Sequence, residues 1–212
     1  MVHDDGLSAR CDELAAVWAT WAAVLRDLPS AAWRQPTRLD GWDVAALVAH
    51  HGRFPGGGLQ RLLEQATDSE PTVASAAALL ARFNEPGGAA TTLAAAVADQ
   101  ARDVAASTPS DALVEPFTVG GPATIAALRA AGNIVVDFFG HGRLQLADVC
   151  AIAVLEATVH LLDLQHALDV APAVPDAALR TTATLLGQVA EPVRFIEAAT
   201  GRTTDNPLPV IR

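Results

Sequence analysis

Apolar side chains recur at three- and four-residue spacing along the first part of the chain, which is the pattern of an amphipathic helix. The repeat begins at Leu7 and ends at Leu28, directly before Pro29 and Ser30, so a helix is expected over residues 7–28. Alanine, the strongest helix former, is abundant throughout, whereas Tyr is absent and Phe occurs only six times. The chain is therefore expected to be all-α.

Further helices are expected between breaks rich in proline and glycine. Asp40 is a candidate cap for the second helix, which Pro55-Gly56-Gly57-Gly58 then interrupts or kinks. Pro192 can bend the last helix, and Gly201 is expected to close it. Residues 133–139 fit either a short strand or a helix end. The expected segments are 42–51, 59–65, 72–83, 91–106, 123–131, 148–168 and 176–199.

These helices, joined by loops of varied length, fit a four-helix bundle with extra short helices and a C-terminal helix. A chain of 212 residues can bury a sizeable core without disulfide bonds. We expect residues 1–170 to form the bundle. Residues 171–212 are expected to add a C-terminal helix and tail that pack on it within the same domain.

The formal charge of −10 disfavours non-specific binding to nucleic acid or to an acidic membrane surface. Cys11 and Cys150 form no C-x-x-C pair, which fits a reducing compartment. The start Met-Val-His-Asp-Asp lacks the features of a signal peptide, and no apolar run reaches the length of a membrane span. A cytoplasmic location is expected.

The segment Glu156-Ala-Thr-Val-His160 carries the strongest chemical signal. Its two functional side chains lie four residues apart, so on a helix they point about 40° from each other on adjacent turns. Such a pair can offer one ion a carboxylate oxygen and an imidazole nitrogen, and Asp163 can accept the other ring N–H of a histidine. A surface ion pair or a hydrogen-bonded core histidine would give the same spacing.

A metal site needs a third ligand from another helix. His50 is the best candidate because it lies two turns into the helix that starts near Trp42. His51 is rotated by about 100° from His50 and is the second choice. His141, between two glycines, fits a loop, and His166 fits a helix surface.

Three segments resemble the mycothiol-dependent maleylpyruvate isomerase family of the DinB-like superfamily. The first reads Trp33-x-x-Pro36-Thr37-x-Leu39-x-Gly41-Trp42-Asp43-Val44-x-x-Leu47-Val48-Ala49-His50. The second is Glu156-x-x-x-His160-x-x-Asp163 within residues 154–164, and the third spans residues 193–202. The resemblance implies a DinB-like bundle in which His50, Glu156 and His160 are the metal ligands.

Two histidines and one glutamate leave open positions on a metal such as Zn²⁺, as in catalytic sites. The resemblance implies that mycothiol, a low-molecular-weight thiol of actinobacteria, enters such a position as co-substrate. Metal charge would turn it into a nucleophile that attacks a small electrophile, so the enzyme would be a transferase or an isomerase. Arg53 and Arg143 are candidates to bind a carboxylate on the thiol or the substrate.

Several alternatives stay open from the sequence. The isomerases that name the family carry a sizeable second domain after the bundle, whereas about 40 residues follow Val170 here, so the maleylpyruvate reaction itself is not carried over from the resemblance. Thiol transfer and isomerisation both stay open. A non-catalytic DinB-like metal-binding or stress-response protein is one alternative, and a thiol-independent metal hydrolase is another. Apolar stripes on Ala-rich helices also leave room for a homodimer.

Overall fold

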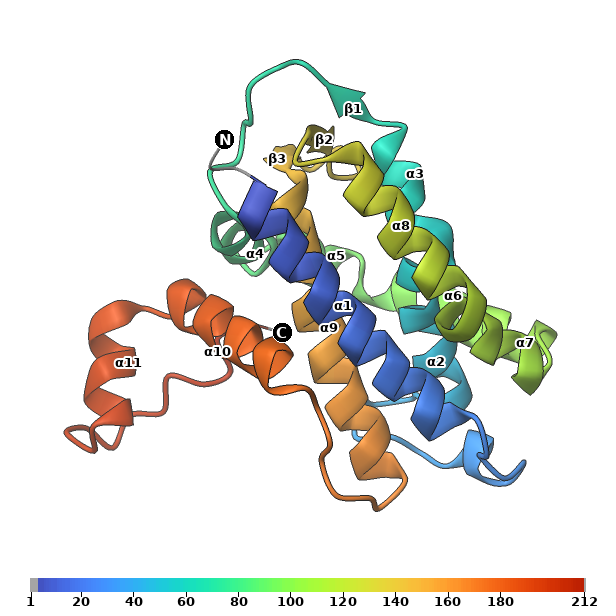
Figure 1. The fold of residues 1–212 in the computed structure, drawn as a ribbon. Coiled ribbons are helices and arrows are strands. Elements are labelled where there is room, and N and C mark those ends of the chain that lie inside the picture. Colours follow the sequence, from blue (N-terminus) through green and yellow to red (C-terminus); the bar gives the residue numbers. More distant parts are fainter. Residues whose placement is uncertain (1–3, 212) are drawn as a thin grey trace.

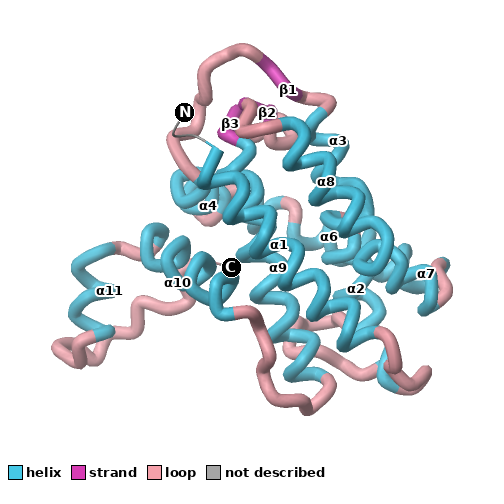
Figure 2. Tube along the Cα trace, in the orientation of Figure 1, coloured by secondary structure: helices cyan, strands magenta, loops and turns pink. Residues whose placement is uncertain are grey.

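The computed structural model describes residues 4–211, and most of them are helical, which confirms the all-α prediction (Figures 1 and 2). The helices are α1 (Asp4–Leu25), α2 (Val44–Gly52), α3 (Leu59–Leu63), α4 (Ala76–Phe83), α5 (Ala89–Thr92), α6 (Ala94–Ser107), α7 (Ser110–Glu115), α8 (Gly121–Ala131), α9 (Leu146–Ala167), α10 (Asp176–Val189) and α11 (Pro192–Ala199). Short strands are β1 (Ala66–Thr67), β2 (Val135–Asp137) and β3 (Arg143–Gln145). Among the described residues, no helix is long and apolar enough to cross a membrane.

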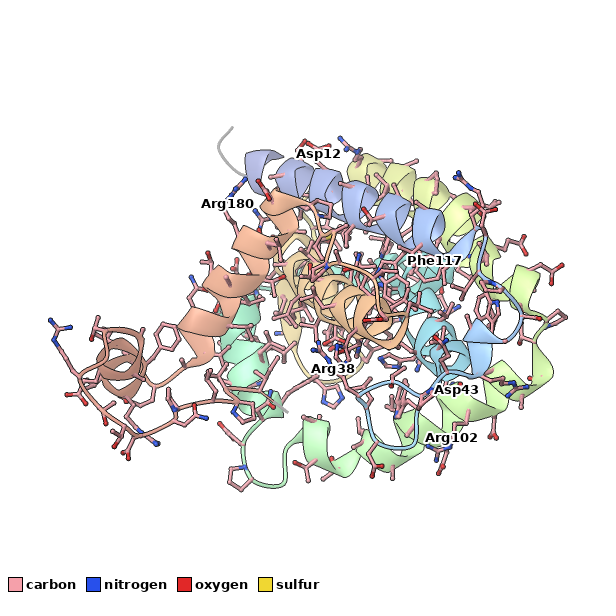
Figure 3. The ribbon with its side chains drawn as sticks, turned by 90° about the horizontal axis from the view of Figure 1, so that it is seen from below. Asp12, Arg38, Asp43, Arg102, Phe117 and Arg180 are labelled. Carbon is pink, nitrogen blue, oxygen red and sulfur yellow. The ribbon has the colours of Figure 1, made fainter. Side chains whose placement is uncertain are left out.

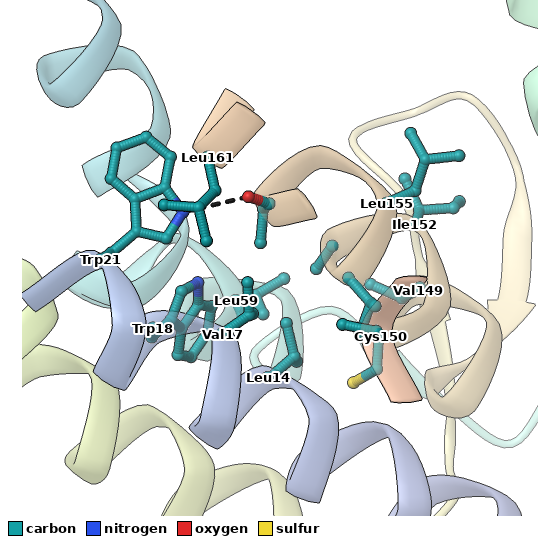
Figure 4. Close-up of a cluster of buried hydrophobic side chains, with 14 of the residues drawn as sticks. Leu14, Val17, Trp18, Trp21, Leu59, Val149, Cys150, Ile152, Leu155 and Leu161 are labelled. Carbon is teal, nitrogen blue, oxygen red and sulfur yellow. Dashed lines mark hydrogen bonds between the residues drawn. The ribbon is translucent and has the colours of Figure 1, made fainter. Parts of the chain in front are cut away.

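The bundle is built on the long helices α1 and α9, which pack against each other, with α8 against α1 and α2 against α9 (Figure 1). Their shared core is visible in Figure 4, where the Trp21 indole donates a hydrogen bond of 3.0 Å to the carbonyl oxygen of Ala157. Cys11 and Cys150 are buried free thiols that contact each other across this interface. Other core side chains from the two helices are Leu14, Val17, Trp18, Val149, Ile152, Leu155 and Leu161.

Two connections between helices contain a proline near their start and are kinked, and the two kinked segments pack against each other. Residues Phe54–Gly58 join α2 to α3, and Pro116–Gly120 join α7 to α8. Gly57 has φ 102°, so the helix that begins as α2 is interrupted before α3, as predicted from Pro55 and the three glycines that follow it. The carbonyl oxygen freed at Pro55 accepts a hydrogen bond of 2.9 Å from the buried Thr124 hydroxyl. The polar group exposed by the first kink is therefore satisfied by a side chain of α8.

Gly120 allows this close approach, because a Cβ at that position would lie 2.7 Å from the carbonyl oxygen of Pro55. We predict that Gly120→Ala lowers the free energy of unfolding by about 1–3 kcal/mol through overpacking. Urea denaturation measures the change. Gly187→Ala in α10 is the matched control, since its Cβ would meet nothing within 4 Å. The control should be neutral or up to about 1 kcal/mol more stable; equal effects of the two substitutions would contradict this account.

The strands form a three-stranded antiparallel sheet in the order β1-β2-β3 at one end of the bundle. Residues 133–139 thus form a strand and its flanks rather than a helix end. The β2–β3 turn holds Phe139 at φ 53°, which is unusual for a bulky residue, and leaves its side chain 58% exposed. The turn therefore presents an aromatic ring outside the core.

Several expected helix boundaries were wrong. Asp40 does not cap α2: the chain turns at Gly41 (φ 74°), and the Asp43 carboxylate accepts from Ala46 N–H instead. The alanine-rich segment is divided into α5 and α6, and the first helix ends at Leu25, a turn before Pro29. The expected last helix is two helices, because the backbone is extended at Ala190 and Glu191 before Pro192.

The C-terminal region meets the bundle through α10, which packs against α1, α4 and α9. Helix α11 has no buried side chain and extends away from the bundle beside α10 (Figure 1). Gly201 follows α11 with φ 68°, as predicted for a helix-closing residue. The proposed division at residue 170 remains a prediction.

Candidate metal centre

Two helices bring the three candidate ligands together. Glu156 and His160 lie one turn apart on α9, and His50 lies near the end of α2, which packs against α9. One donor atom from each side chain lies within 4.8 Å of the other two. The rings of His50 and His160 meet edge to face with centroids 5.2 Å apart. Residues far apart in sequence therefore form one half-buried cluster.

His160 is held between two carboxylates. Its Nδ1 lies 2.9 Å from Oδ2 of Asp163, and its Nε2 lies 3.5 Å from Oε2 of Glu156. The hydrogen bond to Asp163 places the Nδ1 proton on the side away from Glu156, as expected for a carboxylate that orients a ligating histidine. The Nε2 atom is therefore the one that faces the cluster.

The two carboxylates control the charge of His160. Burial favours its neutral form, but hydrogen bonds to Asp163 and Glu156 outweigh burial and raise the pKa of His160 to about 9. Burial also works against ionisation of Glu156, yet the nearby His160 lowers its pKa. The metal-free cluster thus holds a proton on His160 at neutral pH, and a metal would have to displace it.

His50 has the opposite electrostatics. Burial, followed by the charge on His160, lowers the pKa of His50 to about 4. Its ring is neutral at pH 7, and its buried Nδ1 has no hydrogen-bond partner among the described residues. The rings of Trp42 and His50 are nearly perpendicular, with centroids 5.1 Å apart. A neutral, fixed imidazole with an unsatisfied nitrogen is chemically suited to metal binding.

The donor set fits a divalent metal such as Zn²⁺, which takes imidazole nitrogen and carboxylate oxygen ligands. Its bonds are about 2.0–2.2 Å long, so donors up to 4.8 Å apart would need side-chain shifts of about 1 Å or less. The identity of the ligands remains a prediction, which this arrangement supports.

The other histidines lie outside the cluster. His51 faces the core, where its Nε2 accepts from the Trp18 indole at 3.3 Å and its ring stacks on Trp21. Burial holds the pKa of His51 well below its usual value. His141 lies in the β2–β3 turn, where it packs against Phe83, and His166 is exposed on α9. His3 lies outside the described residues.

A small pocket of about 120 Å³ opens beside His50. Arg53 lines it, as the sequence suggested for a carboxylate-binding residue, but Arg143 does not. Arg143 lies on β3, where its Nε donates to the carbonyl oxygen of Glu70, and Arg61 lines the pocket instead. The full lining is His50, Arg53, Phe54, Gly58, Arg61 and Phe139.

Sequence reasoning missed three residues around the centre. Arg61 and Phe139 reach the pocket from α3 and the β2–β3 turn, and no spacing relative to His50 indicates this. Arg38 forms an ion pair with Asp163, its Nε lying 2.6 Å from Oδ1. Arg38 lies between Thr37 and Leu39, inside the motif that ends at His50. Its place in that motif was the one feature of the sequence that could have indicated a role near the metal centre.

Comparison with protein families gives an independent match. The model of the mycothiol maleylpyruvate isomerase N-terminal domain matches residues 14–165, which is more than half of the chain. The chain belongs to this family. The match includes the segments around His50 and His160, whereas residues 193–202 lie beyond it. Searches of curated proteins and of solved structures found no match.

NMR titration of the histidine ring protons in the metal-free protein tests the electrostatics of the cluster. We predict that His160 titrates near pH 9 and His50 near pH 4. Glu156→Gln should lower the pKa of His160, because it removes a negative charge beside the imidazolium. The His50→Gln and His160→Gln spectra assign the signals. Two rings that both titrate near the ordinary value of about 6.5 would contradict the proposed geometry.

Proposed function

We propose that this protein is a metal-dependent enzyme that uses mycothiol as a co-substrate. The observation that carries the proposal is the convergence of His50, Glu156 and His160 in a chain of the mycothiol maleylpyruvate isomerase N-terminal domain family. Two neutral imidazoles and one carboxylate would hold the ion, with Zn²⁺ as the expected metal. The bound ion would supply the positive charge that lowers the pKa of an incoming thiol and makes it a nucleophile.

The chain's own residues prepare this site. Asp163 accepts a hydrogen bond from Nδ1–H of His160 and so keeps Nε2, the nitrogen that would bind a metal once its proton is displaced, directed at the cluster. Glu156 is the only carboxylate among the three ligands, so a dication held there would keep a net positive charge. That remaining charge favours an anionic sulfur over neutral water. Trp42 packs on His50 and restricts the rotation of its ring.

The pocket beside His50 is the proposed place of the reacting groups. Arg53 and Arg61 are exposed at its edge, where their guanidinium groups can pair with a carboxylate on the thiol or on the electrophile. Phe54 and Phe139 give it apolar walls. In the proposed reaction the thiolate adds to an electrophilic carbon of a small substrate with an activated double bond, so that the S–C bond forms as the π bond breaks. Protonation of the displaced electron pair, by the proton that the thiol lost, gives a conjugate. Return of that electron pair after bond rotation expels the thiolate and gives an isomer.

An enzyme is favoured over a non-catalytic DinB-like metal-binding or stress-response protein by the pocket next to His50. A purely structural metal site would be closed by four protein ligands. A metal hydrolase would use the same residues without a thiol, so turnover in the absence of any thiol would identify it. Cys11 and Cys150 are free, which fits the reducing cytoplasm in which a thiol co-substrate persists. A homodimer remains a further proposal.

Metal analysis tests the ligand set. We predict that the purified protein, after incubation with Zn²⁺ and gel filtration, retains about one ion per chain. His50→Ala, Glu156→Ala and His160→Ala should each weaken Zn²⁺ binding by at least about a hundredfold, because each removes a direct ligand. His166→Ala, on the exposed face of α9, should bind like the parent. Stoichiometric metal in all three ligand variants would remove the site assignment.

Calorimetry tests the role of the sulfur. We predict that mycothiol binds the Zn²⁺-loaded protein at least about tenfold more tightly than an analogue in which the thiol is replaced by hydrogen. The preference should disappear in the metal-free protein and in His160→Ala. Equal binding of the two compounds to the loaded protein would exclude metal–thiolate chemistry and leave the hydrolase as the better candidate.

A further inference from the structure

We propose that Arg38 is a positioning residue for the metal centre, which acts on the ligand His160 through Asp163. This inference rests on the proposed function, because it takes His160 as a metal ligand. It adds a residue from a third segment of the chain, the loop before α2, to the two helices that carry the ligands.

The three side chains form a continuous chain of hydrogen bonds. Nε of Arg38 donates to Oδ1 of Asp163 at 2.6 Å, and Oδ2 of Asp163 lies 2.9 Å from Nδ1 of His160. Each oxygen of the carboxylate therefore has its own partner. The Asp163 side chain is only 3% exposed, so water cannot easily replace either Arg38 or His160 as a hydrogen-bond partner.

The two contacts together fix the orientation of the carboxylate. The terminal torsion of an aspartate is broad and is set by its partners rather than by its intrinsic preference. Without Arg38, Oδ1 would lose its described partner in a buried place, and either oxygen could meet the imidazole. The ring of His160 would then be held less firmly. Arg38 also balances the charge of Asp163 once a metal has displaced the proton of His160.

The loop that carries Arg38 is itself well fixed. Pro36 and Asp43 form a β-bridge, and Thr37 N–H donates to the carbonyl oxygen of Trp42 at 2.9 Å. The Thr37 hydroxyl adds a bond of 3.0 Å to the same oxygen. Trp42, on this loop, packs on the ring of His50. One short loop thus contacts a candidate ligand on α2 directly and one on α9 through Asp163.

The outer edge of Arg38 is accessible. Its side chain is 49% exposed and lines an open groove of about 760 Å³ together with Arg34, Trp42 and Arg102. Figure 3 shows Arg38 and Asp43 on this loop, with Arg102 nearby on α6. Arg102 lines the same groove and has its ion pair with Asp99, so it provides a matched control for the loss of an arginine.

The test measures Zn²⁺ affinity by competition with a chelator. Arg38→Ala should weaken binding on the order of tenfold, at the low end of effects known for outer-shell partners. Arg38→Lys should retain most of the Zn²⁺ affinity that Arg38→Ala loses, and Arg102→Ala should bind Zn²⁺ as tightly as the parent protein. In an Asp163→Asn background, Arg38→Ala should have no further effect. A loss that persists in that background would overturn the inference.

Two further measurements separate positioning from a general loss of structure. Thermal melting of the metal-free variants shows whether Arg38→Ala folds. Methylguanidinium should restore Zn²⁺ affinity to Arg38→Ala, since the groove leaves room for it, whereas sodium chloride at the same ionic strength should not. In the Zn²⁺-loaded parent, the Nδ1–H proton of His160 should give a slowly exchanging NMR signal that weakens in Arg38→Ala.

The outcomes distinguish this inference from the proposed function. If the parent protein does not bind Zn²⁺, both the proposed function and the role of Arg38 are contradicted. If the parent binds Zn²⁺ and His160→Ala does not, while Arg38→Ala binds as tightly as the parent, only the role of Arg38 is overturned.

Discussion

Two imidazoles and two carboxylates meet where α2 packs against α9, and the bundle can close there only if their charges are balanced. The half-buried interior penalises every isolated charge. His160 keeps a proton because Asp163 and Glu156 surround it, and the resulting positive charge, together with burial, keeps His50 neutral. The proposed metal would replace that proton with a stronger positive charge. The same arrangement therefore explains how the charges of the cluster are compensated without a metal and why the cluster is suited to a cation.

The rest of the structure fixes the two helices that meet at this point. Large apolar side chains between α1 and α9 set the position of α9, and the paired kinks at Pro55 and Gly120 fix the segments that follow α2 and precede α8. The loop before α2 adds contacts from Trp42 and Arg38. The candidate ligands thus lie on well-packed elements, while the pocket beside them is bordered by exposed arginines and by Phe139 at a strained turn.

The sequence was sufficient for the helical class and for the Glu156–His160 pair, because both depend on local spacing. His50 was added as a candidate by its place in its own helix and by the family resemblance. Glu156 and His160 are neighbours on any helix, and the separation of Trp42 from His50 ties the latter to a recognisable helix start. His51 was correctly assigned to another face by the same geometry. Arg38, Arg61 and Phe139 could not be found in this way, since their relation to the centre depends on tertiary packing between distant segments. Asp40 was the expected cap, and Asp43 was missed because the turn at Gly41, which places Asp43 at the helix start, is not evident from composition.

X-ray absorption at the zinc edge of the loaded protein, with and without mycothiol, tests the central claim most directly. The account predicts a first shell of nitrogen and oxygen with the outer scattering of two imidazoles. Addition of mycothiol should introduce one sulfur at about 2.3 Å. A first shell without imidazole scattering would contradict the ligand assignment, and an unchanged shell at saturating mycothiol would contradict the role of the metal in activating the thiol.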